Sequence, residues 1–183
     1  MVGDFYLAND KVKFIVSAPT RVIGVIPQGG NVVDAALVNG ETQLADDHFG
    51  ELAMIYALGR TCDHERIEIV RDGSGGGVAA LRAIGKTGND DFLNLRGTGL
   101  PVDSSVDPGI DDRLECATTY ILAPGATSLQ ILHTLYNPTA DHLVKGPLGT
   151  IADTGGNTEA WGNSRGFERA GVEAVTSRET API

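Results

Sequence analysis

Four residues in the C-terminal part of the chain combine carboxylates, an aromatic ring and a guanidinium group. They are Asp153, Glu159, Trp161 and Arg165, and they lie in or next to a polar, glycine-rich segment, Thr150 to Gly162, that we expect to be a long loop. A flat aromatic face beside hydrogen-bonding oxygens is the arrangement with which loops recognise sugars. The structural alternative, which we favour, is that the single tryptophan closes one end of the core. If the chain binds a ligand, these four residues are the predicted site.

Cys62 and Cys116 are the only cysteines of the chain. An even count permits a disulfide, which an exported protein would retain. In the chain-entropy model, closing this loop would contribute about 4 kcal/mol to stability. Two buried free thiols are equally compatible with the sequence. Both alternatives stay open at this point.

A zinc site is suggested by His48, Cys62, Asp63 and His64. Zinc sites take ligands in closely spaced pairs, and here only Cys62 and His64 lie close together. Because the ligand pattern is incomplete, we expect no metal at these residues.

The segment from Asp103 to Asp112 is rich in carboxylates, which are contributed by Asp103, Asp107, Asp111 and Asp112. Several oxygen ligands on a bent loop suit Ca²⁺. The spacing does not match an EF-hand loop, and runs of charge are usually solvated surface. We therefore favour a solvated acidic loop, and Ca²⁺ bound at these residues is the alternative.

No catalytic residue is predicted. No catalytic triad can be assembled around the serines, and 24 acidic residues cannot single out a catalytic carboxylate pair. The glycine-rich stretch Arg71 to Gly77 lacks the lysine of a phosphate-binding loop and is followed by a strand-like segment. It is therefore predicted to be a hairpin turn.

The elements that must position these residues are predicted to be β-strands. The chain has 183 residues, and its 24 glycines and 8 prolines separate short runs of Val, Ile, Leu and Thr. Long helices have no room between such breakers. We predict an all-β fold of two packed antiparallel sheets with at most one short helix.

The expected strands follow from alternation and from the turns between them. They are Phe5 to Ala8, Lys11 to Val16, Val22 to Ile26, Asn31 to Val38, Arg66 to Val70, Val78 to Ile84, Glu115 to Leu122 and Ser128 to Tyr136, with a further one starting at Leu143 and another at Gly171 to Val175. Both faces of the segment from Ser128 to Tyr136 are largely apolar, which is typical of a central strand. The segment from Phe49 to Leu58 is the one predicted helix, from its Ala, Leu and Met content.

The chain is predicted to hold a single domain, residues 1–175, followed by a tail, residues 176–183, and it could be a fragment of a longer protein. A formal charge of −10 argues against a nucleic-acid binder, which would need clustered Lys and Arg. No apolar run is long enough to predict a membrane span, and the N-terminus does not have the pattern of a signal peptide.

Two stretches have a recognisable order of predicted strands and turns. Phe5 to Leu37 has a strand, an Asn-Asp turn, a strand and then Gly-Gly-Asn-Val-Val-Asp, and Cys116 to Thr139 has a strand, a Pro-Gly turn, a strand and an Asn-Pro-Thr turn. Both stretches resemble galactose-mutarotase-like β-supersandwich domains. The Asp153-Thr-Gly-Gly and Gly166-Phe167 motifs resemble the N-terminal parts of large exported bacterial proteins. The resemblance implies an extracellular or cell-surface location. Sugar-active members of that fold use His with Asp or Glu, but no histidine here aligns to such a role.

The expected function is that of a non-catalytic structural or interaction module of an exported bacterial protein. Free edges of an incomplete sandwich would let it assemble with other copies of itself or with further domains of the same protein. The alternative is a carbohydrate-binding or carbohydrate-active domain of mutarotase-like type, with carbohydrate as partner.

Overall fold

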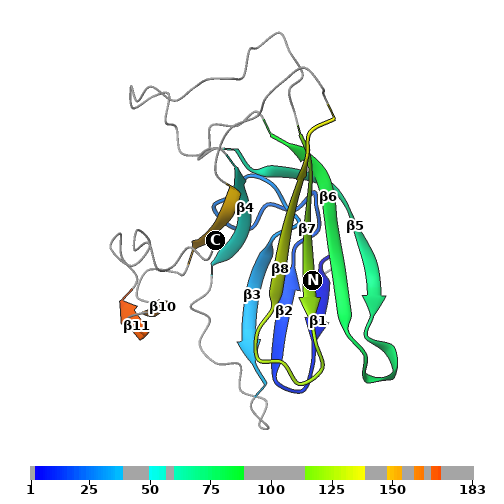
Figure 1. The fold of residues 1–183 in the computed structure, drawn as a ribbon, viewed down its shortest axis with the longest axis vertical. Coiled ribbons are helices and arrows are strands. Elements are labelled where there is room, and N and C mark those ends of the chain that lie inside the picture. Colours follow the sequence, from blue (N-terminus) through cyan, green and yellow to red (C-terminus); the bar gives the residue numbers. More distant parts are fainter. Residues whose placement is uncertain are drawn as a thin grey trace.

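The chain folds into two antiparallel β-sheets, as a computed structural model shows (Figure 1). The structure describes residues 3–38, 50–56, 60–88, 114–138 and 148–153, together with the backbone of 159–162 and 166–169. Within these residues the one helical element is a 3-10 turn, Ser74–Gly76, and no helix is long and apolar enough to cross a membrane. The prediction of an all-β fold with two packed antiparallel sheets is confirmed.

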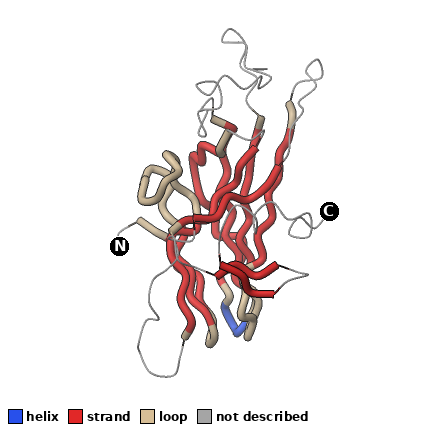
Figure 2. Tube along the Cα trace, turned by 90° about the vertical axis from the view of Figure 1, so that its left-hand side faces the viewer, coloured by secondary structure: helices blue, strands red, loops and turns tan. Residues whose placement is uncertain are grey.

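The two sheets lie as layers, which Figure 2 shows from the side. The first has the order β1-β2-β3-β4-β9, with β1 Phe5–Ala8, β2 Val12–Val16, β3 Val32–Leu37, β4 Glu51–Tyr56 and β9 Leu148–Asp153. The second has the order β5-β6-β7-β8, with β5 Cys62–Asp72, β6 Ala79–Thr87, β7 Glu115–Leu122 and β8 Gln130–Tyr136. A separate two-stranded ladder joins β10 Glu159–Gly162 to β11 Gly166–Arg169.

The main core lies between the layers. It consists of Leu7, Val12, Val16 and Val32 from the first sheet and Leu81, Ala83, Tyr120 and Leu122 from the second. On each strand these residues alternate with residues of the opposite face, as the two-residue period of a strand requires.

The predicted hairpin turns are confirmed at three places: β1 pairs with β2, β5 with β6 and β7 with β8. The side chain of Asn9 makes hydrogen bonds in its own turn and in a second turn. Its Oδ1 accepts the backbone N–H groups of Lys11 and Val12, and its Nδ2 donates to the carbonyls of Ala123 and Ala126. This side chain therefore ties the β1–β2 turn of one sheet to the β7–β8 turn of the other.

The prediction of a helix over Phe49 to Leu58 is wrong, because Glu51–Tyr56 is strand β4. It pairs along its whole length with β9, from Glu51 opposite Asp153 to Tyr56 opposite Leu148. Helix propensity is a weak prior, and pairing with a strand remote in sequence overrides it here.

Three other local predictions are also wrong. The apolar run Val22 to Ile26 is a loop between β2 and β3, in which Ile26 is buried while Val22 and Val25 are exposed. Strand β8 lies at the edge of its sheet, with Leu132 and Tyr136 exposed on its outer face. The predicted loop from Thr150 to Gly162 contains the end of β9 and all of β10.

Strand β5 begins by bending across the inner face of β6 (Figure 1). A Cβ at Gly85 of β6 would overlap the carbonyl oxygen of Asp63, so this close approach requires glycine. The bend brings Cys62 within 6.1 Å of Cys116, Cα to Cα, and the two cysteines form a disulfide. That distance is within the usual range for disulfides. Met54 of β4 and Leu135 of β8 pack around it.

Candidate functional site

The predicted ligand-binding residues are not brought together by the described part of the structure. Asp153 ends β9, opposite Glu51 in register. Glu159 and Trp161 lie on β10, where Trp161 is paired with Phe167. Arg165 lies outside the described residues, as do the acidic segment from Asp103 to Asp112, His48, and residues 176–183. The ligand site therefore stays a prediction.

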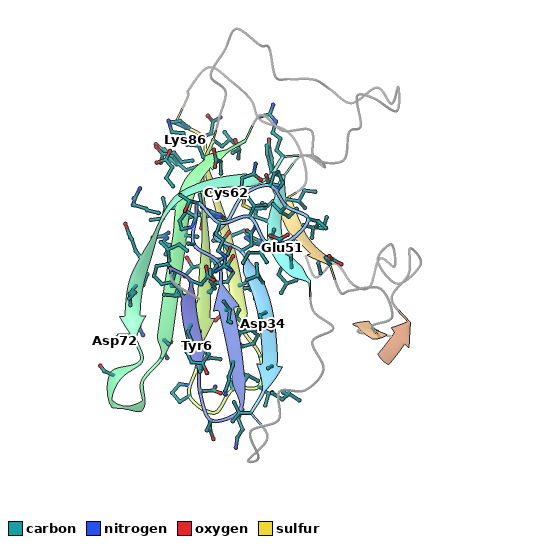
Figure 3. All side chains as sticks on the ribbon, turned by 180° about the vertical axis from the view of Figure 1, so that it is seen from behind. Tyr6, Asp34, Glu51, Cys62, Asp72 and Lys86 are labelled. Carbon is teal, nitrogen blue, oxygen red and sulfur yellow. A yellow bond between two sulfur atoms is a disulfide. The ribbon has the colours of Figure 1, made fainter. Side chains whose placement is uncertain are left out.

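The polar groups that are brought together lie inside the sandwich, around the carboxylate of Glu51. This side chain is 2% exposed. Its Oε2 accepts the backbone N–H of Ile26 at 2.8 Å, and its Oε1 accepts Asn31 Nδ2 at 2.8 Å. Gly24 also lies against it, where any side chain would collide with the carboxylate. Glu51 thus anchors the β2–β3 loop to β4 (Figure 3).

Tyr120 and His64 hold the end of the same loop. The hydroxyl of Tyr120 donates to the carbonyl of Gly30 at 2.9 Å, and His64 Nδ1 lies 2.8 Å from the carbonyl of Gly29. Burial, together with the negative charge of Glu51, raises the pKa of Tyr120 well above its usual value. Carboxylate, phenol and imidazole could serve acid–base chemistry, but here each binds loop backbone. Their arrangement is that of a structural network.

Two histidines in the interior are held in their neutral form. Because a carbonyl accepts only from an N–H, Nδ1 of His64 carries the proton, and its buried Nε2 has no hydrogen-bond partner. Burial lowers the pKa of His64. His133 lies between the hydroxyls of Thr118 and Thr150, at 3.1 and 2.8 Å. Burial, with a smaller effect of His64, lowers the pKa of His133 to about 4.

Stability is therefore expected to fall as the solution becomes more acidic. Below about pH 6.5 the unfolded chain takes up protons at His64 and His133 that the folded chain does not, so stability is complete above this pH and lost below it. We expect a loss of about 1–3 kcal/mol in unfolding free energy between about pH 7 and pH 5, after allowance for the partial exposure of His133. Urea unfolding at a series of pH values measures this loss of unfolding free energy. A His133→Gln variant should lose distinctly less, and an identical loss in that variant would contradict the assignment.

No metal centre is found among the residues that the structure describes, where no three His, Cys, Asp or Glu side chains cluster suitably. The disulfide removes Cys62 from the suggested zinc ligands, because a bonded sulfur offers no thiolate. The predicted calcium segment lies outside the described residues.

A surface groove of about 410 Å³ lies at the opposite end of the sandwich from the Glu51 network. Tyr6, Asp10 and Asp72 line it, together with the glycines of the β5–β6 turn. A second, smaller groove of about 180 Å³ lies beside Tyr6 and Asp34, on β1 and β3 (Figure 3). Tyr6 is exposed. An exposed ring beside carboxylates can contact polar ligands, but none of the buried polar groups lines either groove.

The most extensive unpaired feature is the outer edge of β5. This strand has 11 residues, pairs with β6 on one side, and has no strand partner on the other among the described residues. Ile69 and Val70 on it are 63% and 51% exposed. An exposed edge offers N–H and C=O groups to another strand. The sequence shows the strand but not its position at an edge, so this site was not among the predicted residues.

Comparison of the chain with family models, with curated proteins and with solved structures finds no match. The resemblance to mutarotase-like supersandwich domains therefore stays a prediction.

Proposed function

We propose that this chain is a non-catalytic interaction module that associates through a free strand edge, with other copies of itself or with further domains of the same protein. The observation that carries the proposal is the outer edge of β5, which pairs with no strand in the described part of the chain and exposes Ile69 and Val70. Large apolar side chains on an open edge favour strand addition, because pairing satisfies the backbone groups and removes apolar surface from water.

The interior network supports a non-catalytic role. The carboxylate of Glu51, the hydroxyl of Tyr120 and Nδ1 of His64 are engaged with the loop between β2 and β3, at exposures of 2%, 1% and 3% for the three residues. Groups bound and buried in this way stabilise a fold and are not presented to a substrate.

The proposal includes an extracellular or cell-surface location. Its support is the disulfide between Cys62 and Cys116, because disulfides persist in oxidising compartments and are rare in the reducing cytosol. The resemblance to exported bacterial proteins agrees with this location. Carbohydrate binding is the other function that the sequence suggests. Carbohydrate binding stays the second candidate, because the structure describes only the backbone of its predicted residues Glu159 and Trp161.

Self-association is expected to appear as a mass that rises with protein concentration. Light scattering and sedimentation velocity on the chain, under non-reducing conditions, should show a mass moving from one chain towards two. The mass should rise because association between copies is an equilibrium that shifts towards the dimer as the protein concentration increases. A mass of one chain at every concentration up to the solubility limit would contradict self-association.

A further inference from the structure

We propose that the partner of β5 is β5 of a second copy, paired antiparallel about a twofold axis at Ile67. This inference rests on the proposed function and specifies the strand, the partner and the register. The pairing would join two four-stranded sheets into one continuous sheet, with the same surface used on both copies.

The choice of β5 follows from comparing the four edge strands of the two sheets. Strand β1 has 4 residues, β9 has 6 and β8 has 7, whereas β5 has 11. In addition, β8 and β9 are linked to each other by the contact of His133 with Thr150, 2.8 Å between Nε2 and Oγ1. The longest edge, and the one with exposed Ile69 and Val70, is therefore β5.

The charges on the outer face of β5 are self-complementary. In its middle this face carries Arg66 and Glu68, whose register partners on β6 are Ile84 and Arg82. Antiparallel pairing about Ile67 places Arg66 opposite Glu68 of the second copy. Twofold symmetry repeats the pair, giving two pairs of opposite charge at the centre of the joined edge. Opposite charges across strands stabilise pairing.

The irregularities of β5 limit the pairing to its middle. The pairing with β6 shifts between His64 and Arg66 and again between Ile69 and Arg71, once on each side of Ile67. Between the two shifts the register with β6 is unbroken, and Arg66 and Glu68 lie on one face of the sheet. Before the first shift, the backbone of Asp63 lies against Gly85 over the inner face of β6 and is not part of the free edge.

Neighbouring registers are disfavoured by the same charges. Sliding the second copy by two residues in one direction centres the pairing on Arg66, and in the other direction on Glu68. Either shift puts a charged residue opposite its own copy, and like charges directly opposite are destabilising. Charges on an edge strand usually prevent pairing with another strand. On β5 the charges disfavour the neighbouring registers and favour the register centred on Ile67.

The test is a charge swap between Arg66 and Glu68, both exposed and on either side of Ile67. Arg66→Glu alone puts two glutamates opposite each other, and Glu68→Arg alone puts two arginines opposite each other. Each single variant should weaken the dimer at least about tenfold, since both symmetric pairs change sign. The double variant Arg66→Glu/Glu68→Arg restores opposite charges and should return the dissociation constant close to that of the original chain. Sedimentation velocity measures all four proteins, and circular dichroism checks folding.

The matched control is Asp10→Arg, which makes the same change of net charge as Glu68→Arg at an exposed residue of the β1–β2 turn. It should leave association unchanged. If the chain dimerises but the single variants associate as tightly as the original, or the double variant is not rescued, the β5 register is overturned while self-association stands. If the original chain is monomeric at every concentration, the self-association of the proposed function fails and this inference with it.

Discussion

Removal of the Cys62–Cys116 disulfide is expected to lower the free energy of unfolding by about 4 kcal/mol. The bond joins residues 54 positions apart and fixes the start of β5 where it crosses β6 towards β7. In the chain-entropy model, a cross-link of this span restricts the unfolded chain by about that amount. This is a large fraction of the 5–15 kcal/mol by which domains are typically stable.

Urea unfolding with and without reductant, and of a Cys62→Ala/Cys116→Ala variant, measures the effect. Reductant should shift the midpoint of the original chain and leave that of the variant unchanged, which separates loss of the bond from other effects of the reagent. A thiol assay confirms that reduction took place. An unchanged midpoint in the fully reduced original chain would show that the crossing holds without the bond.

Replacement of Glu51 by alanine is expected to destabilise the fold by about 3–5 kcal/mol. The change leaves the buried N–H of Ile26 without its acceptor, and the Asn31 side-chain amide keeps only its bond to the carbonyl of Gln28. It also opens space where Gly24 now lies against the carboxylate. The loop between β2 and β3 should lose its attachment to β4 and become sensitive to protease.

The matched control is Asp10→Ala, which removes a carboxylate that is exposed and paired on the surface with Lys11, outside β5. This change should alter the free energy of unfolding by no more than about 0.5 kcal/mol. Denaturant titration of both variants, with limited proteolysis followed by mass spectrometry, provides the measurement. Equal stabilities for the two variants would show that Glu51 is not an anchor of the loop.

Local sequence was sufficient where neighbouring residues settle the structure among themselves. The Asn9-Asp10 turn and the turn from Arg71 to Gly77 connect strands that are adjacent in sequence, and turn chemistry with alternation was enough to place them. It failed at Glu51–Tyr56, whose pairing partner Leu148–Asp153 lies far along the chain. Val22–Ile26 was predicted to be a strand because of its apolar content. In the structure it is a loop that is bound to Glu51 through the N–H of Ile26, and nothing in the local sequence indicates this contact.

The sequence by itself determined the fold class and the main hairpins, because these depend on composition and alternation. Only the tertiary structure decided between the disulfide and free thiols at Cys62 and Cys116. It likewise decided that Glu51, Asn31 and Tyr120 form one network, and that β5 lies at an edge. The physical reason is that these outcomes depend on which distant segments meet. Contact between strands separated by many residues leaves no periodic signal in either strand.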